Sequence, residues 1–235
     1  IYLDSKLFER VKHVYDNMKL DNLNTEQKRL VSESYKDFTL NGALLNDTDK
    51  KRIRKIDEEL SKLSPKFSQN TLNATNDYFY FTENESELSG IPDLVKNQAA
   101  DAAKKKGRKS GWMLTLQMPC FMPVMQFAEN RKLREKMARE FGKISYGGKF
   151  DNQKIIKETV SLRYEKARIL GFKDHADYTL QKRMAGKTKN VTDFLDRLYE
   201  VYHPAARVEL NEMRGLAKQD GITEMQSWDS AYYAE

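Results

Sequence analysis

Cysteine is almost missing from this sequence of 235 residues. The single cysteine, Cys120, cannot form a disulfide within the chain, so nothing in the sequence requires an oxidising compartment. Apolar runs are short, and none approaches the roughly 18 residues that a membrane helix needs. Charged, helix-patterned sequence follows Ile1 at once, so we expect no signal peptide and no membrane span. These absences favour the cytoplasm and leave a periplasmic or exported location open.

Histidine is also scarce, and the common catalytic motifs are missing. The three histidines, His13, His175 and His203, lie far apart, and the His-Glu-x-x-His pattern of helical zinc sites is absent. The glycines of "YGGK" have neither the Walker nor the dinucleotide-binding spacing. We expect His175, directly after a helix cap at Asp174, to make local hydrogen bonds. Cys120, among apolar neighbours, is expected to be a small buried hydrophobe rather than a nucleophile.

The excess of positive charge is modest and mostly interleaved with negative charge. The net charge is +6, and most lysines and arginines alternate with Asp and Glu along helical stretches, where i,i+4 pairs form. The one concentrated basic run, Lys104–Lys109, lies where a helix should end at Gly107, and cations are favoured there. We interpret this run as a solvated turn, with anion binding as the alternative. Charge alone therefore gives little support to a nucleic-acid partner, and we expect none.

Helical periodicity is abundant. Apolar residues recur at spacings of three and four, with capping residues before them and glycines after them. Pro65 lies inside one such stretch, so we expect a kink or a restart there. A last helix is expected to open at Asp229, with that side chain as its N-cap. The other predicted helices start near Asp4, Asn24, Asp47, Pro92, Pro123, Asn130, Asp151, Asp174 and Thr188. The apolar faces expected to pack include Leu7, Val11 and Val14 in the first helix, Leu30 in the second, and Ile155, Ile156 and Val160 in the seventh.

Two segments break this periodicity. "DYFYFT", residues 77–82, and "WMLTLQM", residues 112–118, have the length and the aromatic or large apolar content of strands, and we expect them to pair. The methionines Met113, Met118, Met122 and Met125 are interpreted as core packing, with an adaptable binding surface as the alternative. The fold class is therefore mainly α, a multi-helical body with a small β-sheet insertion. The expected segments are helical residues 1–76, a β/α insertion at 77–118 and helical residues 119–235.

Seven stretches together resemble one known family. In chain order they are "YKDFTLNGALL" (35–45), "IDEELSKLSPKFSQNTLNATN" (56–76), "FTENESELSGIPD" (81–93), "ENRKLREKM" (129–137), residues 150–172 with "LRYEKARILGF", "HADYTLQKRMA" (175–185) and "WDSAYYAE" (228–235). Each stretch alone is weakly specific, but their common order is strongly specific. The chain resembles the M3 family of zinc metallopeptidases, the thimet oligopeptidase group, and within it most nearly the bacterial peptidyl-dipeptidases. Pro65 departs from the usual family residue at its position.

The resemblance implies a helical body split by a deep channel that admits short, unstructured peptides. In this family two His and one Glu hold zinc at the channel floor, and the Glu of the His-Glu-x-x-His motif is the general base. Those residues follow the Trp-Asp-x-x-Tyr-Tyr segment and have no counterpart here. The resemblance therefore assigns no catalytic, cofactor-binding or metal residue in this chain, and zinc only to a longer parent enzyme.

We expect from this an internal part of a zinc-dependent peptidase that cleaves short peptides and releases C-terminal dipeptides. This part would form one continuous unit of the channel wall and be inactive alone. Its helix faces would expose apolar groups, and the end after Trp228 would fray, dock on a neighbour or drive self-association. A stand-alone helical interaction module is the alternative, and a basic nucleic-acid binder is a weaker one.

Overall fold

The computed structural model describes residues 1–18 and 22–234. Helices dominate, and two short strands are the only sheet among these residues, so the predicted mainly α class is confirmed. The helices are α1 (Ser5–Asn17), α2 (Thr25–Leu40), α3 (Asp47–Asp77), α4 (Asp93–Lys105), α5 (Met118–Phe127), α6 (Arg131–Phe141), α7 (Gln153–Ile169), α8 (His175–Leu180), α9 (Thr188–Gln219) and α10 (Ser230–Tyr233). The strands are β1 (Phe79–Thr82) and β2 (Trp112–Thr115), and short 3-10 turns cover Glu85–Leu88, Gly148–Phe150 and Ser227–Asp229.

The chain forms two compact units, and each unit is built from two separate stretches. Unit 1 contains residues 1–65 and 155–191, and unit 2 contains residues 66–154 and 192–235. Both α3 and α9 therefore begin in unit 1 and end in unit 2. The division of the sequence at residues 76 and 118 stays a prediction.

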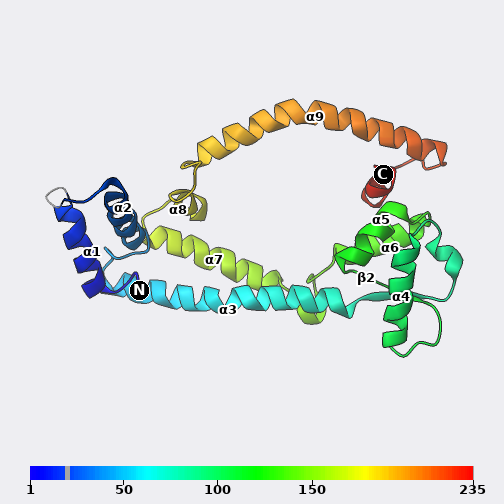
Figure 1. The fold of residues 1–235 in the computed structure, drawn as a ribbon, viewed down its shortest axis with the longest axis horizontal. Helices are drawn as coiled ribbons and strands as arrows, with labels where there is room; N and C mark the ends of the chain where they lie inside the picture. Colours follow the sequence, from blue (N-terminus) through cyan, green and yellow to red (C-terminus); the bar gives the residue numbers. More distant parts are fainter. Residues whose placement is uncertain (19–21, 235) are drawn as a thin grey trace. The chain divides into compact units, whose positions relative to one another are not determined.

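Unit 1 is held together by two clusters. Phe8 of α1 stacks on Tyr35 and Phe38 of α2, with ring centroids 5.8 and 5.9 Å apart. The second cluster joins α3 to α7, which run side by side (Figure 1). Its buried members are Ile56 and Leu63 of α3 with Ile155 and Leu162 of α7. Two ion pairs flank that cluster, Arg52 with Glu165 at 2.5 Å and Lys166 with Asp57 at 2.5 Å.

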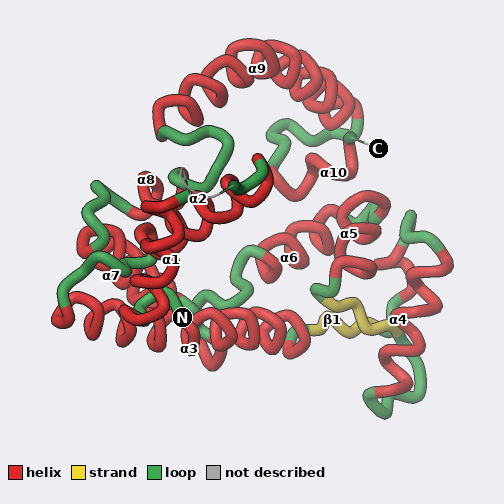
Figure 2. The backbone as a smooth tube through the Cα atoms, turned by 60° about the vertical axis from the view of Figure 1, so that its left-hand side comes forward, coloured by secondary structure: helices red, strands yellow, loops and turns green. Residues whose placement is uncertain are grey.

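Unit 2 contains the sheet and the largest core cluster. β1 and β2 pair antiparallel, from Phe79 opposite Thr115 to Thr82 opposite Trp112, which confirms the predicted pairing (Figure 2). Their common core is formed mainly by helices α4, α5 and α6 with strand β2. Its fully enclosed side chains include Leu88, Leu114, Leu116, Val124, Ala128 and Met137. Burial of this apolar surface is the main force that holds unit 2 together.

The second strand is shorter than the predicted residues 112–118. It ends at Thr115, and Met118 begins α5 instead, with Pro119 in the first turn and Pro123 inside the helix. A proline in the first helical turn needs no N–H partner, so Pro119 starts a helix here rather than closing a strand. The helix predicted from Pro123 thus begins five residues earlier.

The predicted restart at Pro65 is wrong, because α3 is one helix of 31 residues that contains this proline. The proline removes one backbone donor, but packing of Ile56 and Leu63 on α7 keeps the flanking turns helical. The short helix predicted to run from Asp174 to Met184 is also shorter, ending at Leu180.

Several apolar faces differ from the prediction. In α1 the buried residue is Phe8, while Leu7 and Val14 are exposed. In α7 Ile155 is buried as expected, but Leu162 packs with it, and Ile156 and Val160 face solvent. Leu30 of α2 is exposed too. The 3.6-residue period locates a helix well, but two apolar stripes on one helix leave open which of them the neighbour covers.

A buried aspartate between two arginines as the candidate functional site

Helix α6 carries two arginines on one side. Asn130 caps the helix by accepting a hydrogen bond from the Leu133 backbone N–H at 3.3 Å. Residues three apart on a helix are neighbours, so Arg131 and Arg134 lie one turn apart on the same side. Leu133 and Met137 anchor the helix in the core of unit 2.

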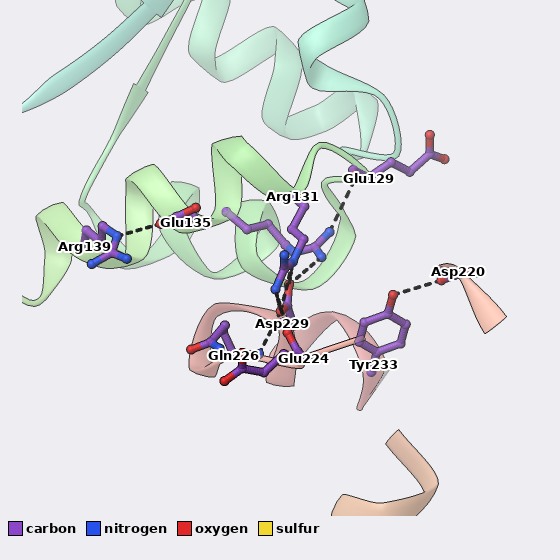
Figure 3. A network of polar contacts seen from close by, with 10 residues as sticks. Glu129, Arg131, Glu135, Arg139, Asp220, Glu224, Gln226, Asp229 and Tyr233 are labelled. Carbon is purple, nitrogen blue, oxygen red and sulfur yellow. Dashed lines mark hydrogen bonds and ion pairs between the residues drawn. The ribbon is translucent and has the colours of Figure 1, made fainter. Parts of the chain in front are cut away.

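Both arginines bind Asp229, which lies almost a hundred residues later in the sequence. Figure 3 shows the pair of Arg131 with Asp229. Arg131 donates from Nε to Oδ1 at 3.0 Å and from Nη2 to Oδ2 at 2.8 Å. Arg134 donates from Nη2 to Oδ1 at 2.9 Å. The Asp229 side chain is 0% exposed and that of Arg134 only 1%, whereas Arg131 is partly open to solvent. This geometry combines a two-pronged pair with a second, fully enclosed cation.

Backbone groups satisfy most of the remaining polar atoms. The Gln226 backbone N–H donates to Oδ2 of Asp229 at 3.0 Å. Arg131 Nη2 also donates to the Glu224 carbonyl at 3.0 Å, and Arg134 Nη1 donates to the Ala128 carbonyl at 2.7 Å. Arg134 Nε is a buried donor without a partner among the described residues. The cluster therefore holds residues 224–229 against α6 through contacts to both arginines.

Asp229 was predicted to cap the final helix with its side chain. It does stand immediately before α10, but its carboxylate makes no cap hydrogen bond to that helix. The carboxylate instead accepts from the Gln226 N–H and from the two arginines. Charged guanidinium donors bind a carboxylate more strongly than neutral backbone N–H groups do. The Asp229 carboxylate therefore binds the arginines instead of capping α10.

Aromatic rings of the same segment pack over the cations. The Tyr232 ring lies 4.1 Å from the guanidinium carbon of Arg134, and the Trp228 ring lies 4.8 Å from that of Arg139. The Tyr233 hydroxyl donates to Asp220 at 2.9 Å, and burial together with this hydrogen bond raises its pKa to about 12. Within unit 2, the segment from Trp228 onward is thus held on α6 by charge and by cation–π contacts, and on Asp220 by a tyrosine hydrogen bond.

Burial alone would raise the pKa of Asp229. The hydrogen bonds from Arg131, from the Gln226 backbone and from Arg134 outweigh that effect, and its pKa lies below the usual value. Asp229 is therefore ionised at neutral pH and has no tendency to exchange a proton there. The arrangement holds a segment in place and offers neither a general acid nor a nucleophile.

The three histidines, for which the sequence predicted no metal-binding role, are dispersed in the structure. His13 lies on α1, where its carbonyl accepts a hydrogen bond from Asn17, and His203 stacks on Tyr199 within α9 at 4.5 Å. His175 begins α8, half-buried beside Thr179, and burial with nearby Arg163 and Lys166 lowers its pKa. Throughout residues 1–18 and 22–234, no three His, Cys, Asp or Glu side chains gather as metal ligands. The described residues therefore do not fit a zinc ion.

Cys120 is half-buried in α5, against the core of unit 2. The Thr115 backbone N–H donates to its sulfur at 3.3 Å, and burial raises the pKa of the thiol. A protonated thiol is a poor nucleophile. The structural interpretation made from the sequence is thus favoured, although the side chain is not fully enclosed.

The basic run is exposed, as a solvated turn would be, whereas the interpretation of the methionines as core holds for only two of the four. Lys104–Lys109 is exposed at the C-terminal end of α4, with Gly107 at φ +79° and Arg108 over the Phe81 ring at 4.7 Å. Of the four methionines read as core, Met113 and Met125 are buried, and Met118 and Met122 are exposed.

The sequence reading missed Arg131 and Arg134 entirely. Their spacing of three was visible and indicated a doubly charged helix side. Their carboxylate partner lies 95 residues or more away, and nothing local identifies it. The stretch "ENRKLREKM" was noted for a helix that starts near Asn130 and for its resemblance.

Comparisons with known proteins address the same part of the chain. Residues 124–235, which contain α6, α9 and the Asp229 cluster, match the model of peptidase family M3. This chain belongs to peptidase family M3. It is 38% identical over 215 residues to oligopeptidase A of Haemophilus influenzae, covering 89% of this chain and 31% of that protein. It is 35% identical over 235 residues to oligopeptidase A of Escherichia coli, covering 97% of this chain and 34% of that protein.

The M3 relatives also include a dipeptidyl carboxypeptidase of Escherichia coli, 28% identical over 237 residues, with 100% of this chain and 35% of that protein covered. Sequence identity is thus higher to these two oligopeptidases A than to this dipeptidyl carboxypeptidase, although the sequence resemblance pointed to the bacterial peptidyl-dipeptidases. The chain spans about a third of the length of the curated relatives it matches. No helix in the described part of the chain is long and apolar enough to cross a membrane.

Proposed function

We propose that this chain is part of a zinc-dependent M3 peptidase that hydrolyses short peptides. The observation that carries the proposal is the family match over residues 124–235, together with relatives named as peptidases that align over 89% to 100% of the chain. The zinc ligands and the general base would come from outside these residues, and no residue of this chain would be catalytic. The cytoplasmic location belongs to the same proposal.

The role proposed for this chain is to form the wall of a peptide channel. Stretches 1–76, 77–118 and 119–235 would together serve as one structural part of the enzyme. Support comes from the two helices of more than thirty residues, α3 and α9, because long helices suit a wall better than a compact catalytic centre. Release of C-terminal dipeptides is the finer proposal, and it rests on the likeness to the dipeptidyl carboxypeptidase.

A chimera tests this function. In it the aligned third of the Escherichia coli oligopeptidase A is replaced by this chain, and hydrolysis of internally quenched short peptides is measured with and without a zinc chelator. We expect chelator-sensitive hydrolysis by the chimera, and no stoichiometric zinc and no hydrolysis by this chain alone. The relative with the aligned third deleted is the control.

Mass spectrometry of the products then separates dipeptide release from internal cleavage. Stoichiometric zinc with chelator-sensitive hydrolysis by the isolated chain would contradict the proposal that its residues carry no active site. A folded, zinc-loaded chimera without any hydrolysis would contradict the peptidase function.

The alternative of a stand-alone interaction module is less well supported, because residues 124–235 match the model of peptidase family M3.

A further inference from the structure

A hollow in unit 1 lies where the end of α2 meets α8. Its volume is about 390 Å³, within the roughly 300–1,000 Å³ of small-molecule sites. The residues that line this α2–α8 hollow are Leu40, Asn41, Tyr178, Thr179, Lys182 and Arg183. All of them belong to unit 1, so the hollow is formed by that unit alone.

Contacts within unit 1 position the walls of the hollow. The Tyr178 hydroxyl donates to Oδ1 of Asn41 at 3.4 Å, and the Tyr178 ring lies 5.4 Å from the ring of Phe172. Lys182 forms an ion pair with Asp37 in the last turn of α2. These contacts join α8 and the residues after it to α2, so the packing of unit 1 sets the shape of the hollow.

The lining offers hydrogen-bond donors and no carboxylate. Lys182 and Arg183 carry positive charge, and Thr179 adds a hydroxyl, whose oxygen lies 3.4 Å from Nε2 of His175. Lys182 is paired with Asp37, whereas the Arg183 guanidinium has no hydrogen bond or ion pair to any residue in the described part of the chain. One of the two positive charges is therefore left without a counter-charge.

The charge around the hollow has the same sign. Residues 163–189, all in unit 1, contain eight Lys and Arg against three Asp and Glu, while the net charge of the whole chain is +6. The three acids already have partners, which are Arg52 for Glu165, the first turn of α8 for Asp174 and the Thr188 hydroxyl for Asp177. Burial and then the neighbouring Arg163 and Lys166 lower the pKa of His175. Such an excess of positive charge raises the local concentration of anions.

The helix ends explain only part of this arrangement. The carbonyl end of a helix favours cations, and both α2 and α8 end at the hollow. Lys182 meets that preference and pairs with Asp37 as well. Arg183 remains without an anion, and the hollow beside it has room for one.

We propose that the α2–α8 hollow binds a small oxyanion, either a carboxylate or a phosphate group. The guanidinium of Arg183 is a planar fork of donors that matches two oxygens of such a group. Lys182 and Thr179 donate to the same group from the wall. The ligand is thus an acidic peptide or a phosphate-bearing small molecule, and the assignment does not rest on the proposed peptidase function.

Isothermal titration calorimetry of the chain tests the site with three probes. They are inorganic phosphate, a peptide of two glutamates blocked at both ends, and the same blocked peptide with glutamines in place of the glutamates. We expect saturable binding of phosphate or of the glutamate peptide, at one per chain. The glutamine peptide should not bind, because it lacks an oxyanion for the Arg183 fork.

Two variants that lose the same charge separate the site from its surroundings. Arg183→Gln removes the fork and should weaken binding about tenfold or more, since a hydrogen bond to a charged group contributes at least that factor. Arg168→Gln is the matched control, because Arg168 is exposed on α7 within the same basic stretch but does not line the hollow. Both arginines are exposed, so both variants should fold, and circular dichroism checks this.

Each result has a definite meaning. Saturation by phosphate alone, lost in Arg183→Gln, assigns the site to phosphate-bearing ligands, and saturation by the glutamate peptide alone assigns it to acidic peptides. Equal weakening by Arg168→Gln and Arg183→Gln would overturn the proposal, because the general positive charge would then account for binding. The absence of saturable binding by both anions would also overturn it. None of these results bears on peptide hydrolysis by the chimera.

Discussion

Arg134 and Asp229 form an ion pair of 2.9 Å that is shielded from solvent on both sides, with exposed fractions of 1% and 0%. The pair joins α6 to the segment before α10 across 95 residues of sequence. A buried pair of this kind contributes little net stability by itself, because desolvation of both charges offsets their attraction. Removing only one partner is different, because an uncompensated charge remains inside the protein.

We therefore expect Asp229→Asn to destabilise unit 2 by about 3–5 kcal/mol, since two guanidinium groups lose their counter-charge. Urea unfolding followed by the fluorescence of Trp112 and Trp228 measures the change. Glu58→Gln is the control, because its pair with Lys62 is well exposed and should contribute little to stability. A similar small effect for both variants would show that the Asp229 cluster is not a structural tie.

The same aspartate should make stability depend on acidity. Its folded-state pKa is lowered, so its contribution is complete above the unfolded pKa of about 3.9 and is lost as pH falls through the lower folded value. The difference in unfolding free energy between the wild type and Asp229→Asn should thus shrink as the pH falls below the unfolded pKa toward the lower folded one. A difference that grows on acidification would mean that the pKa is raised instead.

Gly90 is expected to tolerate no side chain. Its φ is +82°, and a Cβ atom there would lie 2.1 Å from the Phe127 carbonyl oxygen. Gly90→Ala combines left-handed strain with this clash and should cost about 3 kcal/mol or more. Gly171→Ala is a matched control, since Gly171 has φ +86° and open space around it, and only the strain of about 1–2 kcal/mol applies. Thermal unfolding of both variants decides whether the clash adds to the strain.

Replacing Pro65 should stabilise the protein. Alanine restores a backbone donor in the middle of α3 and removes a clash that costs about 3 kcal/mol in a helix interior, so Pro65→Ala should raise the unfolding midpoint. Pro92→Ala, just before α4, should have little effect, because no intrahelical donor is needed there. A lower midpoint for Pro65→Ala would indicate that α3 needs its proline.

Local chemistry made most element boundaries predictable. The sequence predicted helix starts near Asp4, Asn24, Asn130 and Asp174, and each of these side chains accepts a hydrogen bond from the first turn of its helix. The two strands could be predicted because aromatic and large apolar residues without helical period stand out in a helical sequence. These signals act over a few residues, so they can be recognised in the sequence without knowledge of the fold.

What could not be predicted depends on distant partners. The choice between Leu7 and Phe8 as the buried side of α1 is made by the rings of α2. The role of Asp229 is decided by two arginines almost a hundred residues earlier, which outcompete its use as a cap. The continuity of α3 through Pro65 was not predicted for the same reason, since contacts of α3 with α7 maintain the helix around it.

The interleaving of the two units has a consequence for synthesis on the ribosome. All residues of unit 1 have been made once residue 191 has emerged, whereas unit 2 lacks its last stretch until after Asp229, although residues 66–154 came earlier. At about 5–20 residues per second, the nascent chain spends a few seconds in this state. During that time Arg131 and Arg134 have no carboxylate to neutralise them. A nascent chain of this protein would therefore pass through an interval in which a finished unit 1 is carried beside an unfinished unit 2, open to chaperones and proteases.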